Sequence, residues 1–136
     1  MRTRALFLLY ALGVLALTMP FAWAHRPRFD TRPWWEMVHW IPFWVDPVSM
    51  ALNVVLFVPF GILVPLLWPW AAPARRLGWL SLSTSLAIEL TQLIFLITLD
   101  VRRTVDINDL IANTGGALIG LWILRSVRAR QPAASR

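Results

Sequence analysis

Long apolar runs constrain this chain more than any other feature of its sequence. They cover about residues 5–24, 47–70, 77–99 and 106–124. A transmembrane helix needs about 20 mostly apolar residues to cross a hydrocarbon core about 30 Å thick. Hydrophobic residues make up 58% of the chain, which is too many for an ordinary soluble domain of this size. The sequence therefore predicts an all-α membrane protein, a bundle of four transmembrane helices.

The remaining segments complete this organisation. We expect residues 1–124 to form one transmembrane domain and residues 125–136 to form a basic cytoplasmic tail. Residues 1–24 also resemble a cleavable signal peptide, because a basic head and an apolar core precede Ala22-Trp23-Ala24. Tryptophans beside charged residues crowd the stretch 25–45, a pattern typical of segments at headgroup level. We predict a Trp-rich interfacial extracytoplasmic loop there, either a lid over a membrane site or an aromatic anchor.

The arginines predict the orientation. The N-terminal head, the turn at 71–76 and the tail carry 2, 2 and 4 arginines and no acidic residue. The two other connections carry 3 and 2 arginines together with acidic residues. By the positive-inside rule, both termini are cytoplasmic in a multi-pass membrane protein. The arginines flank apolar runs and form no basic stripe, so no nucleic-acid partner is predicted.

Several classes of site find no support in the composition. Cysteine is absent, so thiol catalysis and thiolate metal sites are excluded. The two histidines, His25 and His39, lie 14 positions apart and belong to no ligand motif. We predict no metal site and no cofactor.

Polar side chains inside or next to the apolar runs are the candidate functional residues, because polar groups in a bilayer are costly without partners or a function. The short connection between the last two runs makes them antiparallel neighbours. Counting the helical rise from that connection places Gln92 level with Asn113, and Glu89 level with Gly116. We expect one outward-opening polar cluster, composed of Asn53, Glu89, Gln92, Arg103, Asp106, Asp109 and Asn113.

Most of these residues also have a structural interpretation, which for Arg103 is a headgroup anchor. Asp106 is well placed to cap the fourth helix, with Asp109 in its first turn. Gln92 and Asn113 are suited to interhelical hydrogen bonds. Glu89 lies near the expected midplane, where a carboxylate needs a partner or a proton. It is the strongest functional candidate.

Three glycines are predicted to pack helices rather than bind a ligand. They are Gly61, Gly116 and Gly120. Gly116 and Gly120 form a small-xxx-small notch that lets another helix approach closely. The same notch would support a homo-oligomer.

Three stretches together resemble the VanZ-like family. They are Asn53-Val-Val-Leu-Phe-Val-Pro-Phe-Gly61, the segment Ser85 to Gln92 with Glu89-Leu-Thr-Gln92, and Arg103-Thr-Val-Asp106-Ile-Asn-Asp109-Leu-Ile-Ala-Asn113-Thr-Gly-Gly116-Ala-Leu-Ile-Gly120. The chain has His39-Trp-Ile-Pro-Phe43 where family members often have Asn-Leu-Ile-Pro-Phe, so the resemblance assigns no role to His39. It implies a small polytopic membrane protein, in a family named for low-level teicoplanin resistance.

Three hypotheses follow for function. The first is a non-enzymatic cell-envelope protein that modulates teicoplanin susceptibility by binding a membrane lipid or a lipid-linked envelope component at the outer leaflet. The second is a membrane-embedded enzyme acting on a phosphate-bearing lipid-linked substrate, although no nucleophile motif or nucleotide loop is present. The third is a proton-linked transporter that uses Glu89, for which four spans are few. No catalytic residue is assigned, and the first hypothesis is preferred.

Overall fold

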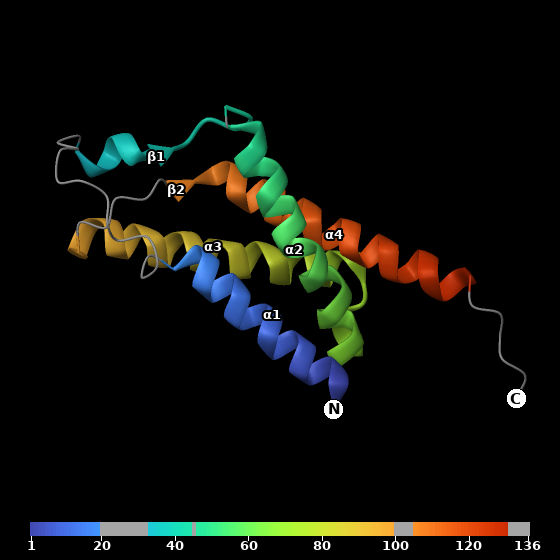
Figure 1. Cartoon of the computed structure of the whole chain (residues 1–136). Helices are drawn as coiled ribbons and strands as arrows, with labels where there is room; N and C mark the ends of the chain where they lie inside the picture. Colours follow the sequence, from blue (N-terminus) through green and yellow to red (C-terminus); the bar gives the residue numbers. More distant parts are fainter. Residues whose placement is uncertain (20–32, 45, 100–104, 131–136) are drawn as a thin grey trace, which may run out of the picture.

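Four helices form the bundle that the apolar runs predict. The computed structural model describes residues 1–19, 33–44, 46–99 and 105–130. The helices are α1 (Arg2–Thr18), α2 (Pro47–Leu67), α3 (Ala74–Leu99) and α4 (Ile107–Arg130) (Figure 1). In the described chain, α2, α4 and residues 74–98 of α3 are long and apolar enough to cross a membrane. The predicted all-α membrane bundle is therefore confirmed. Residues 20–24, the end of the first predicted span, lie outside the described residues.

The helix ends follow local chemistry. The Asp46 carboxylate caps α2 by accepting a hydrogen bond of 2.9 Å from the backbone N–H of Ser49, and Pro47 takes the first helical position. α4 continues past the predicted end at Leu124 to Arg130, so the first half of the predicted tail is helical. Arginines in that last turn suit the negative end of the helix dipole. The rest of the tail lies outside the described residues.

The tightest contact in the bundle joins α2 to α4 through the three predicted glycines. A Cβ added at Gly61 would lie 1.9 Å from the carbonyl oxygen of Ala117. A Cβ at Gly116 or Gly120 would lie 2.2 or 2.1 Å from a backbone oxygen of α2. Only glycine permits so close an approach. The notch at Gly116 and Gly120, which was predicted to support a homo-oligomer, is thus occupied by α2 of the same chain. Self-association itself stays a prediction.

The other helices pack around this pair. α3 lies antiparallel to α4, as the short connection predicts, and its side chains bond to the first half of α4. α1 packs on α2, where the Tyr10 hydroxyl donates to the Leu56 carbonyl at 3.0 Å. The main apolar core lies between these helices. Its central side chains include Phe57, Phe60, Val64, Leu77 and Leu121.

A small irregular layer covers the end of α3. It consists of the short helix η2 (Trp34–Met37) and two parallel strands, β1 (Val38–His39) and β2 (Val105–Asp106) (Figure 1). Val38 pairs with Val105, and His39 pairs with Asp106. Met37, Val38 and Val105 pack on Leu96 of α3 as a second apolar core. The sequence analysis did not predict this strand pair.

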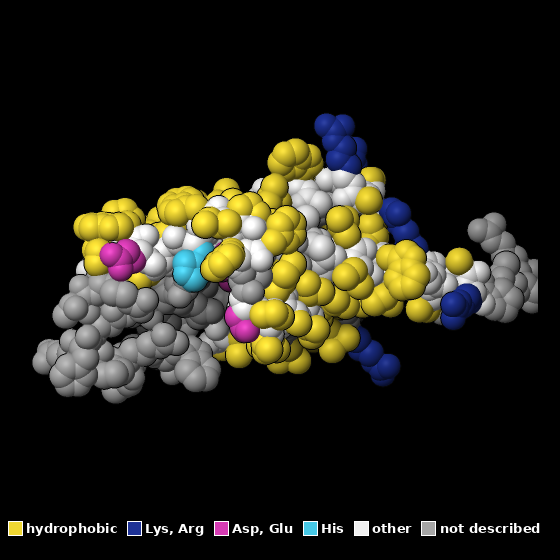
Figure 2. All heavy atoms as spheres, turned by 90° about the horizontal axis from the view of Figure 1, so that it is seen from above, with side chains coloured by type: hydrophobic (Ala, Val, Ile, Leu, Met, Phe, Trp, Pro, Cys, Tyr) yellow, Lys and Arg dark blue, Asp and Glu magenta, His cyan; other side chains and the backbone are white. Residues whose placement is uncertain are grey.

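The face of the described chain that Figure 2 shows is largely apolar. In Figure 2 the arginines lie toward one end, and the visible acidic side chains and a histidine lie toward the other. The described arginines come from the start of α1, the start of α3 and the end of α4. The Trp-rich segment lies at the opposite end, where Trp34, Trp35, Trp40 and Trp44 are exposed.

Candidate functional site

Glu89 of α3 is joined to the beginning of α4. Its carboxylate accepts a hydrogen bond of 3.1 Å from the backbone N–H of Asp106, and both residues are buried. A backbone N–H in an apolar interior requires an acceptor, and Glu89 supplies one at the residue where β2 passes into α4. The expected register was wrong here, because Glu89 lies level with Asp106 and not with Gly116.

Within the described chain, the Asp106 carboxylate makes three contacts. Its Oδ1 accepts from the backbone N–H of Asn108 at 2.8 Å and from the Asn108 side-chain amide at 2.7 Å. The first of these bonds is the cap of α4 that the sequence predicts. Its Oδ2 lies 3.4 Å from Nδ1 of His39. Asp106 therefore links the start of α4 to the histidine on the neighbouring strand.

Asn108 holds the loop that follows β1. It is completely buried. Its side-chain amide donates to the Ile41 carbonyl at 3.2 Å, and its Oδ1 accepts from the Phe43 N–H at 2.6 Å. Phe43 has a φ of 65°, a left-handed conformation that is costly for an aromatic residue unless its surroundings hold it. Asn108 supplies part of that support.

Two further pairs join the helices deeper in the bundle. The Asn53 amide of α2 donates to the Asp109 carboxylate of α4. The Asn113 amide of α4 donates to the Ser85 hydroxyl of α3 at 2.8 Å. The Ser85 hydroxyl lies 3.5 Å from the Asp109 carbonyl. These pairs form a polar line between α2, α3 and α4 that stabilises their packing.

The Asn53–Asp109 pair makes a testable energetic prediction. We expect Asn53→Ala and Asp109→Ala each to lower the free energy of unfolding by about 1–3 kcal/mol, since each removes one partner of an interhelical hydrogen bond. The double variant should lose at least about 0.5 kcal/mol less than the sum of the single losses. Chemical unfolding in micelles, followed by circular dichroism, measures all three variants. As a control, Asn53→Ala combined with Thr91→Ala should be additive, because in the described chain the Thr91 hydroxyl bonds only to its own helix, at Ala87. Additive losses at Asn53 and Asp109 would contradict the pairing.

Gln92 does not join these pairs in the part of the chain that the structure describes. The Gln92 amide donates to the Thr18 carbonyl at 2.9 Å and so ties α3 to the end of α1. This is the interhelical role that the sequence analysis gave as its alternative, with a different partner helix. Arg103 lies outside the described residues.

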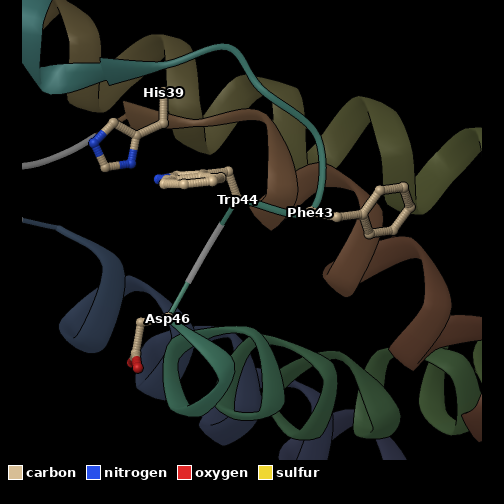
Figure 3. A pocket seen from close by; sticks show the side chains of 4 residues that line it. All are labelled: His39, Phe43, Trp44 and Asp46. Carbon is tan, nitrogen blue, oxygen red and sulfur yellow. The ribbon is translucent and has the colours of Figure 1, made fainter.

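The His39–Asp106 pair reaches the surface at an open hollow of about 370 Å³. It is lined by His39, Phe43, Trp44 and Asp46 (Figure 3). In Figure 3 the His39 and Trp44 rings lie on one side of the opening, and Asp46 lies on the other side at the start of α2, with its carboxylate pointing away from both rings. The His39 side chain is 49% exposed, whereas that of Asp106 behind it is 10% exposed. We call this the outer hollow.

The sequence analysis missed His39, Ser85 and Asn108. His39 acquires its partner through strands of two residues each, which are too short for a period-two pattern. Ser85 was missed because the predicted register between α3 and α4 was shifted by about two turns. Asn113 was expected to face Gln92, but it bonds to Ser85. Asn108 had no local signal, because its loop partners Ile41 and Phe43 lie 67 and 65 positions away in the sequence.

Comparison with known proteins identifies a family for this chain. The sequence model of the VanZ/LLP1 family matches residues 5–128. Neither the curated proteins nor the solved structures contain a significant match.

Proposed function

The chain belongs to the VanZ/LLP1 family, in agreement with its sequence resemblance to VanZ-like proteins, and from this premise we propose that it is a non-enzymatic membrane protein that binds a lipid headgroup in the outer hollow. The ligand is a membrane lipid or a lipid-linked envelope component. Through it, the protein modulates envelope properties such as teicoplanin susceptibility. The observation that carries the proposal is a hollow with polar and aromatic walls, next to exposed tryptophans and backed by a buried hydrogen-bonded network.

The charge distribution supports an outward-facing hollow. Arginines gather at the end of the bundle that holds the start of α1 and the end of α4 (Figure 2). With that end at the cytoplasmic face, as the positive-inside rule favours, His39 and Asp46 face the outer leaflet. Exposed Trp40 and Trp44 are then at headgroup level, where tryptophan is enriched. The proposal places the protein in the bacterial cytoplasmic membrane with both termini inside.

The hydrogen bonds behind the hollow support binding by a rigid wall. Asn108 holds the backbone of Ile41 and Phe43, and Asp106 lies behind His39. Glu89 in turn accepts from the backbone of Asp106. A preformed wall lowers the entropic cost of binding. In this proposal the buried residues position the binding surface, and the outer hollow contacts the ligand.

Trp44 and Trp79 provide a matched test. Both indoles are exposed, at 78% and 61%, but only Trp44 lines the hollow. We expect Trp44→Ala to weaken saturable lipid binding about tenfold, as loss of an aromatic anchor does, and Trp79→Ala to leave it unchanged. Neither variant should shift the unfolding midpoint. Titration of short-chain phospholipids onto the protein in nanodiscs, followed by native mass spectrometry, measures binding.

A complementation assay tests the cellular role. A bacterium lacking the chain should recover wild-type teicoplanin susceptibility and envelope lipid content with the Trp79→Ala variant and not with Trp44→Ala. Equal lipid binding by both variants would overturn the location of the site. Absence of saturable binding to the wild-type protein would overturn the proposed function.

A further inference from the structure

The loop of residues 40–44 supplies two of the side chains that line the outer hollow, those of Phe43 and Trp44. We infer that this loop is a gate for the ligand of the hollow, and that the buried Asn108 side chain is the latch that holds the gate closed. The gate rests on the proposed function, because it concerns the same ligand. The latch can be measured without a ligand. We call residues 40–44 the gate loop.

The gate loop packs little of its own surface on the bundle. All of its residues are exposed, and the exposed fractions of Ile41, Phe43 and Trp44 are 65%, 74% and 78%. Among the described residues, its internal hydrogen bond is the one from the Trp44 N–H to the Ile41 carbonyl at 3.4 Å, longer than the usual range of about 2.7–3.2 Å. A segment with few buried apolar contacts opens at a lower free energy than a core helix. The position of the loop therefore depends on its hydrogen bonds to the bundle.

Asn108 makes those bonds from the start of α4. Its side-chain amide donates to the Ile41 carbonyl at 3.2 Å, and its Oδ1 accepts from the Phe43 N–H at 2.6 Å. Asn108 is completely buried, and its amide also donates to the Asp106 carboxylate. It is therefore held within the bundle and cannot follow the loop outward. When the gate loop moves away, both of its bonds to Asn108 break.

Phe43 gives the closed loop a tendency to open. Its φ of 65° lies in the left-handed region, where the Cβ crowds the neighbouring backbone and raises the free energy. Once the Asn108 bonds are released, Phe43 can return to a negative φ. In Figure 3 the Phe43 and Trp44 rings project from the loop in opposite directions, so a change in this backbone angle moves one ring relative to the other. The hollow then loses the wall that these two residues form.

Opening of the gate loop controls how a ligand leaves. The closed loop is the preformed wall of the hollow, and a ligand held against Trp44 is released when that wall moves. The apparent affinity falls with the fraction of molecules in which the hollow is closed. Asn108 thus acts on binding through the loop, without contact with the ligand.

Glycine and alanine at position 43 form a matched pair for measuring the latch. Both remove the Phe43 ring, but only glycine adopts the left-handed conformation without strain. Hydrogen exchange of the residue 43 amide is followed by NMR on the full chain in nanodiscs, with rates corrected for residue type. We expect this amide to exchange about fivefold more slowly in Phe43→Gly than in Phe43→Ala. The amide of Ala117, a buried residue within α4, should exchange equally in the two variants.

Asn108→Ala removes the latch itself. We expect the Phe43 amide to exchange at least about tenfold faster in this variant than in the wild type, because two hydrogen bonds to the loop are lost. The Ala117 amide reports whether the variant keeps its fold. If it does not, the glycine and alanine variants still test the latch.

The gate is tested by the rate at which a short-chain phospholipid dissociates from the two position 43 variants. We expect dissociation about fivefold slower from Phe43→Gly than from Phe43→Ala, in step with amide exchange. Equal amide exchange in the two variants overturns the latch and leaves lipid binding standing. Different amide exchange with equal dissociation rates overturns the gate. Absence of saturable phospholipid binding to the wild-type protein overturns the proposed function, and the gating of a ligand with it.

Discussion

The Gly116→Ala variant is expected to lose about 2–3 kcal/mol of unfolding free energy, since overpacking in a close contact costs about that much. The added methyl would lie 2.2 Å from the Val54 carbonyl oxygen and 2.9 Å from its carbon. Those atoms belong to the backbone of α2, which cannot move aside by changing a rotamer. To make room, α2 and α4 must separate along their length, and the contacts at Gly61 and Gly120 are lost with them.

Gly115 provides the control next to it in the sequence. A methyl added there meets nothing within 4 Å. Gly115→Ala should be neutral or should stabilise α4 by up to about 1 kcal/mol, the difference in helix propensity. Detergent unfolding of both variants, followed by circular dichroism, makes the comparison. If the two variants prove equally stable, α2 and α4 are not as close as described.

Replacing Glu89 is expected to have the second large effect. Glu89→Leu removes an acceptor from the buried N–H of Asp106, and an unsatisfied buried donor costs about 1–3 kcal/mol. Because Asp106 also contacts Asn108 and His39, lipid binding at the outer hollow should fall with stability. Glu89→Gln keeps an oxygen acceptor and should retain much of both properties. Thermal unfolding and lipid titration of each variant test this expectation.

Thr98→Leu is a suitable control on the same helix. Its side chain is exposed, and its hydroxyl bonds only to the Ile94 carbonyl of α3. The change should leave stability and lipid binding as in the wild type. Complete loss of lipid binding in Glu89→Gln, equal to that in Glu89→Leu, would show that the carboxylate charge is essential and would count against a role limited to hydrogen bonding.

The register between α3 and α4 could not be predicted from the sequence. The prediction assumed that α4 begins where α3 ends, which set Gln92 opposite Asn113. Residues 105–106 are instead extended and lie beside α3 at Glu89, about 15 Å before its last residue. As a result Ser85 faces Asn113. The length of a connection does not show whether it turns at once or runs back along the helix.

By itself, the sequence determined that the chain folds in a membrane and that its scaffold is a bundle of helices. The features that determine this are local, and each acts through one helix and its surroundings. They are the apolar runs of membrane length, the arginine distribution, the cap at Asp46 and the small residues at 61, 116 and 120. The tertiary structure alone decided which polar groups meet. Pairing of His39 with Asp106, the hold of Asn108 on the Phe43 loop and the outer hollow depend on two-residue strands far apart in the chain. Such contacts arise only when packed helices bring those segments together, because no periodic pattern within either segment encodes its partner.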